Sequence, residues 1–348
     1  MFDTLLTTDL HFTDKDSDSY RFSVFDTIHG ILDIHPDIDS LFILGDLTTF
    51  KDGHPAKLVS LVVTGMVQLA KRVQVHIIKG NHDYLVDPSL PFFGFLDEIE
   101  GIHFYSVPGV VNLEWGSVYV VPHSRTKLED REDINWELLR QCESVFMHET
   151  FGGSKSSNGM VMEGTPTSFL DGRIKRLCFS GDIHVPQRVR DVVYVGTPYP
   201  VNYGDDFKPR MVLFDSGTSD YKSLAVEAIR KEALVTNVGG VVDDLRALDL
   251  VEGDMVKLRV RVPTNKHDDW VRERAEVVKE LKDCGVVLGG ISVTSSLKRV
   301  ALTDIPKPTV LSYSTHGVLE RFAELNGLAP SFVTAGQVLL DENRKINS

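Results

Sequence analysis

Short apolar runs recur along the first half of the chain, and several of them end abruptly in polar residues. Runs of this length, bounded by polar positions, predict buried β-strands. Helical periodicity separates some of them, because residues 22–34 and 57–72 each place apolar side chains on one helical face. Alternating strands and helices up to about residue 215 predict a layered α/β domain. Five of the apolar runs are residues 4–7, 41–44, 75–78, 144–147 and 177–179.

A different pattern follows the turn-forming segments at residues 216–220 and 237–240. Residues 256–262 alternate strictly, residues 268–283 form an amphipathic pattern that Gly285 closes, and residues 290–300 again suit a strand. This is a compact strand-helix-strand module. Residues 315–326 and 331–342 predict two short helices separated at Gly327 and Pro330. We therefore expect domains at residues 1–232 and 233–312, and a C-terminal helical segment at residues 313–348.

Composition narrows the class of protein. Hydrophobic residues at 42% and charged residues at 25% are ordinary for a water-soluble chain, and no apolar run reaches membrane-spanning length. Asp3 and Asp9 stand where a signal peptide would be basic and apolar, so we expect a cytoplasmic protein without membrane contact. Cys142, Cys178 and Cys284 have no metal-ligand spacing and suit a reducing compartment. The net charge of −13 argues against a basic nucleic-acid surface over the whole chain.

The polar residues that follow the five apolar runs share one chemistry. Carboxyl ends of strands are where α/β proteins place ligands, and residues two apart at a strand end can direct a carboxylate and an imidazole to one cation. Asp46 can bridge two ions, and Asn81 offers a neutral oxygen. Nitrogen and oxygen donors without thiolate favour Mn²⁺, Mg²⁺, Fe or Zn²⁺ over Ca²⁺, and Mn²⁺ is our first expectation. The clusters are Asp9-Leu10-His11, Gly45-Asp46, Gly80-Asn81-His82-Asp83, His148 and Gly181-Asp182-Ile183-His184.

Each cluster alone has a simpler interpretation. Asp9-x-His11 is a frequent chance pattern, Gly45-Asp46 is a common turn, and residues 80–83 suit a tight turn with satisfied side chains. Five clusters that each follow a strand favour a two-metal site, which suits phosphoryl displacement. His123 follows another apolar run and is left unassigned. The remaining histidines suit surface or packing positions: His29, His35, His54, His76, His103 and His316.

The ordered clusters resemble the calcineurin-like metallophosphoesterase superfamily. That resemblance rests on Asp9, His11, Asp46, Asn81, His82, His148 and His184. Residues 181–187, Gly-Asp-Ile-His-Val-Pro-Gln, and the Gly-Thr-Pro turn within residues 194–205 are similar to the SbcD-type DNA repair and recombination nucleases. The resemblance implies a four-layer αββα sandwich with a smaller α/β capping domain and C-terminal helices. The short chain is similar to bacteriophage members, which would act in the host cytoplasm.

The resemblance also implies roles for individual residues. Asp9, His11 and His184 would hold one metal ion, Asp46 would bridge, and Asn81, His148 and Asp182 would hold the other. His82 would act on the leaving oxygen, with Asp83 beside it. The activity would be hydrolysis of phosphodiester bonds at DNA ends, by exonuclease and endonuclease cutting. The implied partners are DNA and an SbcC-type coiled-coil ATPase, with a homodimer inside the hetero-oligomer. Residues 331–342 would dock that ATPase or pack on their own domain.

Two positions depart from the family pattern. Asp182 stands where the family has the first histidine of its Gly-His-x-His segment, and this harder ligand favours Mn²⁺ or Mg²⁺ over Zn²⁺. Thr49 stands three residues after Asp46, where some relatives carry a histidine or aspartate that supports the catalytic histidine. His82 is then oriented by Asp83 or by a backbone group.

Three functions follow from these residues. The first is the DNA nuclease subunit, for which Arg21, Lys51, Arg125, Lys127 and Arg188 are candidate phosphate contacts. Lys257, Arg259 and Arg261 line one face of a predicted strand, which is either a solvated face or a DNA-facing one. The second function is a phosphatase or cyclic-nucleotide phosphodiesterase on the same metals. A protein phosphatase is disfavoured because residues 47–50 lack Asp-Arg-Gly. The third is a catalytically weak scaffold for the ATPase.

Overall fold

The computed structural model describes residues 2–87, 89–295, 319–320, 323–324, 326–327 and 329–346. The chain forms two compact units. Unit 1 comprises residues 1–234, 250–257 and 281–290, and unit 2 comprises residues 235–249, 258–280 and 291–348. The domain boundaries expected at residues 232 and 312 stay predictions.

Unit 1 contains two six-stranded sheets. In the first, β1, β2, β3 and β4 are parallel neighbours, β11 is antiparallel to β1, and β12 at the edge is antiparallel to β11. In the second, β6, β7, β8 and β10 are parallel, with β5 and β9 antiparallel at the edges. The first sheet consists of β12 (Tyr221–Ala225), β11 (Arg210–Phe214), β1 (Thr4–Thr7), β2 (Ser40–Ile43), β3 (Gln74–Ile78) and β4 (Ile102–Tyr105). The second consists of β5 (Gly109–Asn112), β6 (Ser117–Val121), β7 (Ser144–Met147), β8 (Leu177–Ser180), β10 (Val192–Tyr194) and β9 (Gln187–Val189).

Three apolar cores separate the layers of unit 1. Side chains alternate along a strand, so Leu41 and Ile43 of β2 face one core while Phe42 faces another. Phe42 meets Phe146 of the second sheet with ring centroids 4.9 Å apart. The core between the sheets is therefore shared by both. The other two cores lie on the outer faces of the sheets.

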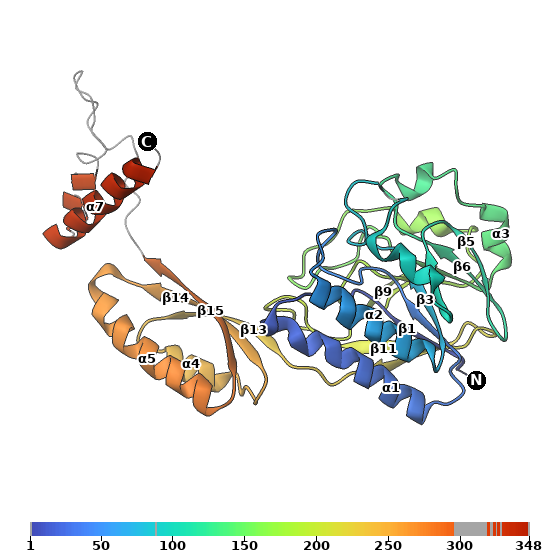
Figure 1. Ribbon diagram of the computed structural model, residues 1–348, viewed down its shortest axis with the longest axis horizontal. Helices are drawn as coiled ribbons and strands as arrows, with labels where there is room; N and C mark the ends of the chain where they lie inside the picture. Colours follow the sequence, from blue (N-terminus) through green and yellow to red (C-terminus); the bar gives the residue numbers. More distant parts are fainter. Residues whose placement is uncertain are drawn as a thin grey trace, which may run out of the picture. The chain divides into compact units, whose positions relative to one another are not determined.

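Helices cover those outer faces. Helices α1 (Val24–Ile34) and α2 (Ala56–Ala70) bury Ile28, Leu32, Leu58 and Val62 against the first sheet, and both helices lie along it in Figure 1. Helix α3 (Trp136–Gln141) buries Leu139 in the core of the second sheet's outer face. The layers are thus helix, sheet, sheet and helix, the predicted metallophosphoesterase sandwich. Short 3₁₀ helices are η1 (Asp16–Ser23), η2 (Phe92–Glu98), η3 (Leu128–Asp130) and η4 (Thr167–Leu170).

The remaining strands are β13 (Lys231–Asn237), β14 (Met255–Val262) and β15 (Val287–Ser295), which form a three-stranded sheet. Helices α4 (Val241–Ala247) and α5 (His267–Asp283) lie on one face of it (Figure 1), and η5 spans Thr264–Lys266. Leu258, Val260 and Val262 are buried, while Lys257, Arg259 and Arg261 are exposed on the other face of β14. Helix α7 (Pro330–Ile346) follows.

The expected strands at residues 4–7, 41–44, 75–78, 144–147, 177–179 and 256–262 and the expected helices at residues 22–34, 57–72, 268–283 and 331–342 are confirmed to within a few residues. Strand β15 covers the first part of the strand expected at residues 290–300, whose second part lies outside the described residues. Strand β13 and helix α4 were not anticipated, because their apolar residues are too few to produce a clear period. The segment at residues 216–220 is the turn between β11 and β12, inside the first sheet. The helix expected at residues 315–326 lies mostly outside the described residues. Within the described residues, no helix combines the length and apolarity needed to cross a membrane.

Candidate metal centre

All the candidate ligands lie on loops at the carboxyl ends of parallel strands. Asp9 and His11 follow β1, Asp46 follows β2, and Asn81 and His82 follow β3 of the first sheet. His148 follows β7, and Asp182 and His184 follow β8 of the second sheet. Because the two sheets pack face to face, their carboxyl edges meet and both sets of loops converge. The structure therefore brings together every ligand position inferred from the sequence.

Backbone hydrogen bonds hold the first two loops beside each other beyond their strands. The amides of Asp9 and His11 donate to the carbonyls of Gly45 and Asp46, each at 3.0 Å. The backbone here is left-handed at four candidate ligands, with φ of 52° at Asp9, 45° at His11, 58° at Asp46 and 73° at Asp182. Residues with side chains rarely adopt this conformation, and it gathers at functional sites. The loops hold the ligands in fixed directions.

Glycines make room for the ligands that follow them. A β-carbon on Gly45 would overlap the imidazole of His148, and one on Gly80 would overlap the carboxylate of Asp46. A β-carbon on Gly181 would meet the Leu44 carbonyl and His148. The glycine in each Gly-Asp or Gly-Asn pair is therefore required by close packing of the loops, which explains a feature that the sequence showed only as a repeated pattern.

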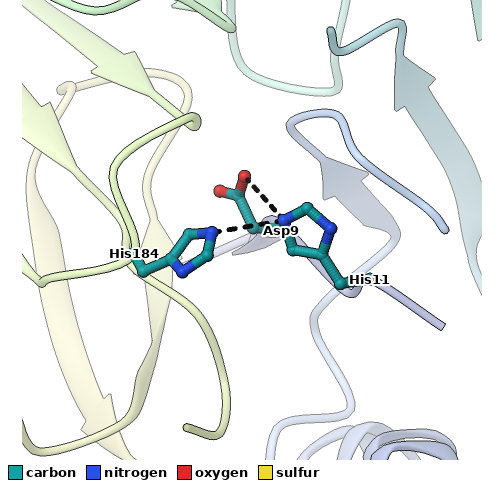
Figure 2. A group of neighbouring side chains, drawn as sticks. All are labelled: Asp9, His11 and His184. Atoms are coloured by element: carbon teal, nitrogen blue, oxygen red, sulfur yellow. Dashed lines mark hydrogen bonds and ion pairs between the residues drawn. The ribbon is translucent and has the colours of Figure 1, made fainter. Parts of the chain in front are cut away.

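One group of side chains joins the ends of β1 and β8. Asp9, His11 and His184 each offer a ligand atom within 4.8 Å of the others, and Figure 2 shows the three converging. The Nε2 atoms of His11 and His184 are 3.2 Å apart. Two nitrogen ligands about 2.1 Å from the same ion lie about 3.0 to 3.4 Å apart. This spacing suits a shared cation.

Asp46 lies between that group and a second one. Its Oδ2 is 3.6 Å from His11 Nε2, and its Oδ1 is 3.5 Å from His148 Nε2. His148 Nε2 is also 3.7 Å from Asp182 Oδ1. The two carboxylate oxygens of one buried residue thus face two different histidines, which is the arrangement that a bridging carboxylate requires.

Several of these side chains keep one polar atom free. Asp9 Oδ2 accepts a hydrogen bond from Thr8 Oγ1 at 2.7 Å, while its Oδ1 is buried without a hydrogen-bond partner. His148 Nδ1 donates to the Leu44 carbonyl at 2.6 Å, which leaves Nε2 buried without a hydrogen-bond partner. Asn81 Oδ1 is also buried and unpartnered. Unpaired buried polar atoms are costly, so three of them on converging loops indicate a missing partner that accepts lone pairs. A divalent cation fits this description.

The charges of the site indicate the same partner. Burial raises the pKa of the Asp9 carboxyl to about 8, with the His148 charge opposing this shift and the Asp46 charge adding to it. Burial and the nearby Asp83 charge raise the pKa of Asp46 well above its ordinary value. Burial and His184 lower the pKa of His11 well below its ordinary value. Asp9 and Asp46 are thus crowded carboxylates beside a His11 ring that burial keeps neutral. A bound cation would supply positive charge at this place.

His82 is oriented by the backbone rather than by Asp83. Its Nδ1 lies 2.8 Å from the Thr49 carbonyl, so the ring donates there and keeps Nε2 free. Its ring centroid is 5.0 Å from that of His11. Asp83 is buried, and its carboxylate accepts hydrogen bonds from the amides of Asp46, Leu47 and Gly80. The Thr49 carbonyl, a backbone group, therefore orients His82. Asp83 instead holds the loops after β2 and β3 together.

Arg21 does not have the position expected of a DNA contact. Its side chain is buried, and its guanidinium donates to the His11 carbonyl and, at 3.3 Å, to Thr49 Oγ1. Asp18 pairs with it at 3.3 Å. Arg21 is thus part of the interior support of the loops, which sequence could not show because its partners are distant in the chain. Arg125, Lys127 and Arg188 are exposed, and Lys51 is half-buried.

Two residues near the site carry no motif. Thr150 Oγ1 donates a hydrogen bond to Asp182 Oδ2. His123, left unassigned above, lies with its ring centroid 6.1 Å from that of His148, and its Nδ1 is 2.9 Å from the Tyr84 hydroxyl. The only sequence signal for either was its position just after a strand of the second sheet.

Comparison with known proteins decides the family. The sequence model of the calcineurin-like phosphoesterase family matches residues 2–186, which is more than half of the chain. The chain belongs to the calcineurin-like phosphoesterase family. A solved structure of a protein of unknown function from Aquifex aeolicus has 16% identity, covers 50% of this chain and 87% of its own, and gives a TM-score of 0.27. No curated protein matches the sequence.

Family and geometry together support the general class of reaction, a metal-dependent hydrolysis. This calcineurin-like phosphoesterase has the fold of a metal-dependent hydrolase, and the matched residues include every strand and loop of the candidate site. Its Asp and His clusters supply the side chains for a metal site.

Proposed function

We propose that this chain is a DNA nuclease subunit that uses two divalent ions to hydrolyse phosphodiester bonds at DNA ends, together with an SbcC-type ATPase in recombination or repair. The observation that carries the proposal is Asp46, whose two oxygens face His11 on one side and His148 on the other. One ion would be held by Asp9, His11 and His184, the other by Asn81, His148 and Asp182. Mn²⁺ suits these nitrogen and oxygen donors best.

Two ions bound here would supply the positive charge that activates water and polarises the phosphate. The side chains divide the remaining work. Asp9, His11, Asp46 and His148 are buried, whereas Asn81, His82, Asp182 and His184 are half-exposed. The phosphate would therefore enter from the half-exposed side, where His82 lies.

His82 is suited to act on the leaving oxygen. The Thr49 carbonyl fixes Nδ1 of His82 as a donor. In the imidazolium form Nε2 carries the second proton, which can pass to the departing 3′ oxygen and leave a neutral ring. A group of this kind contributes about 10²- to 10⁴-fold in rate. The loss of His82 should therefore lower turnover without removing the ions.

DNA as the substrate is supported by the segments resembling SbcD at residues 181–187 and 194–205. Exposed Arg125, Lys127 and Arg188 lie in or near loops that follow the ligand-bearing strands or their neighbours, and they are candidate phosphate contacts. Exposed Phe332 and Val338 on α7 support a role of this helix as an ATPase-docking element.

The test is degradation of end-labelled duplex DNA with Mn²⁺, by the native chain and by His82→Ala. We expect nucleotide release from the native chain and a loss of about 10²-fold or more in the variant. His103→Ala is the matched control, because His103 is exposed on β4 outside the site, and it should keep native activity.

Other outcomes would contradict the proposal. Activity of the native chain on small phosphoesters alone would indicate a phosphatase or cyclic-nucleotide phosphodiesterase. Inertness of the native chain on every phosphoester, with the ATPase present, would indicate a scaffold.

A further inference from the structure

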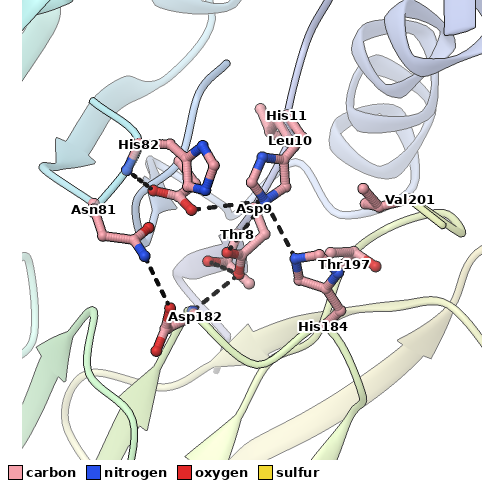
Figure 3. A network of polar contacts seen from close by, with 12 residues as sticks. Thr8, Asp9, Leu10, His11, Asn81, His82, Asp182, His184, Thr197 and Val201 are labelled. Atoms are coloured by element: carbon pink, nitrogen blue, oxygen red, sulfur yellow. Dashed lines mark hydrogen bonds and ion pairs between the residues drawn. The ribbon is translucent and has the colours of Figure 1, made fainter. Parts of the chain in front are cut away.

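Asp182 makes more contacts than a metal ligand needs. Its Oδ2 accepts a hydrogen bond from the Thr150 hydroxyl, and its Oδ1 lies 3.5 Å from the amide nitrogen of Asn81. Its own backbone amide donates to Asp9 Oδ2 at 3.2 Å. Figure 3 shows Asp182 between Asn81 and Asp9. The carboxylate therefore connects loops from both sheets.

The contact with Asp182 decides which way the Asn81 amide points. A carboxylate only accepts hydrogen bonds, so the Asn81 nitrogen faces it and the amide oxygen faces away. That oxygen is buried and has no partner. It is the atom that a second ion would require.

A histidine at position 182 could not do the same while binding a metal. When one ring nitrogen gives its lone pair to an ion, the other carries a hydrogen and only donates. That nitrogen could not accept a hydrogen bond from the Asn81 amide or from the Thr150 hydroxyl. The aspartate thus accepts hydrogen bonds from two donors at once, which a metal-bound histidine cannot do.

We propose that Thr150 and Asp182 form an orienting pair that directs the Asn81 oxygen to the second ion and selects ions that prefer oxygen donors, such as Mn²⁺, over Zn²⁺. Thr150 is a positioning residue here, because it acts through Asp182. This inference rests on the proposed two-metal site and adds which ions that site prefers.

The test measures the binding of Mn²⁺ alone and Zn²⁺ alone to the full chain by isothermal titration calorimetry. Thr150→Val keeps the shape of the side chain and removes the hydroxyl, so one of the two Mn²⁺ ions should bind about tenfold less tightly. Thr150→Ser restores a hydroxyl and should bind within about twofold of the native chain. Asp182→His should shift the preference from Mn²⁺ toward Zn²⁺ by about tenfold or more.

Thr236→Val is the matched control. Thr236 also donates its hydroxyl to an aspartate, Asp244, but both belong to unit 2 and neither is near a candidate ligand in sequence. Losing this bond should leave both binding constants unchanged. Circular dichroism checks that each variant is folded.

Two results would overturn the inference, and they differ. If Thr150→Val is folded and binds two Mn²⁺ ions as tightly as the native chain, the orienting pair is wrong while the two-metal site stands. If the native chain binds no ions, the proposed function fails and the inference fails with it.

Discussion

At the scale of single residues, two buried side chains of the centre use only one of their polar atoms in a hydrogen bond with the protein. Thr8 holds one oxygen of Asp9, and the Leu44 carbonyl holds one nitrogen of His148. The second polar atom of each side chain, Oδ1 of Asp9 and Nε2 of His148, is buried without a hydrogen-bond partner. Left-handed backbone at Asp9 and Asp46 adds about 1–2 kcal/mol of strain for each residue. These costs lower the stability of the metal-free fold, and bound ions would offset them.

His76 provides a pH-dependent test outside the site. It is buried on β3, with its ring 4.4 Å from that of Phe42 and its Nδ1 2.9 Å from the Tyr105 hydroxyl. Burial and the neighbouring His103 lower its pKa to about 3. Between pH 6.5 and pH 3 the unfolded chain therefore binds a proton that the folded chain does not. This residue stabilises the fold above pH 6.5, and that contribution is lost as the pH falls toward 3.

His76→Gln should reduce the slope of unfolding free energy against pH in this window by up to about 1.4 kcal/mol per pH unit. Urea denaturation of the chelator-treated protein at several pH values measures the slope. The exposed His103 provides the control variant His103→Gln, which should reduce the slope much less. Equal slopes for the native chain and His76→Gln would show that His76 titrates normally in the fold.

At the scale of elements, the turn after β2 carries the bridging carboxylate. Gly45 has φ of 97°, and any β-carbon there would overlap His148. The sequence showed strand, glycine and aspartate in the right order, because apolar runs mark strands and glycine marks turns. It could not show that this glycine touches a histidine 103 positions later in the numbering. The roles of Thr150 and Arg21 were not predictable for the same reason, since they depend on contacts between distant segments.

Gly45→Ala should therefore cost about 3 kcal/mol or more of unfolding free energy, from the left-handed backbone and from the overlap together. Gly53→Ala is the matched control, because Gly53 also has a positive φ, of 66°, but nothing lies within 4 Å of its added β-carbon. It should cost about 1–2 kcal/mol. Urea midpoints and slopes give both values. Equal losses would mean that His148 moves aside without cost.

At the scale of the whole molecule, three apolar cores hold two sheets so that their carboxyl edges meet. Apolar runs that alternate with helical patterns up to about residue 215 were sufficient to predict the layered α/β fold. The family resemblance added the sandwich and the ligand set. What the sequence could not supply was the support around the ligands: the Thr49 carbonyl on His82, the Leu44 carbonyl on His148, and the interior position of Arg21.

The most direct measurement is anomalous diffraction at the manganese absorption edge from crystals soaked in Mn²⁺. We predict two peaks about 3.5–4 Å apart, one on each side of the Asp46 carboxylate. The first should contact Asp9, His11 and His184, and the second Asn81, His148 and Asp182. Absence of any peak among these residues, or a single peak that Asp46 does not contact, would contradict the two-metal centre.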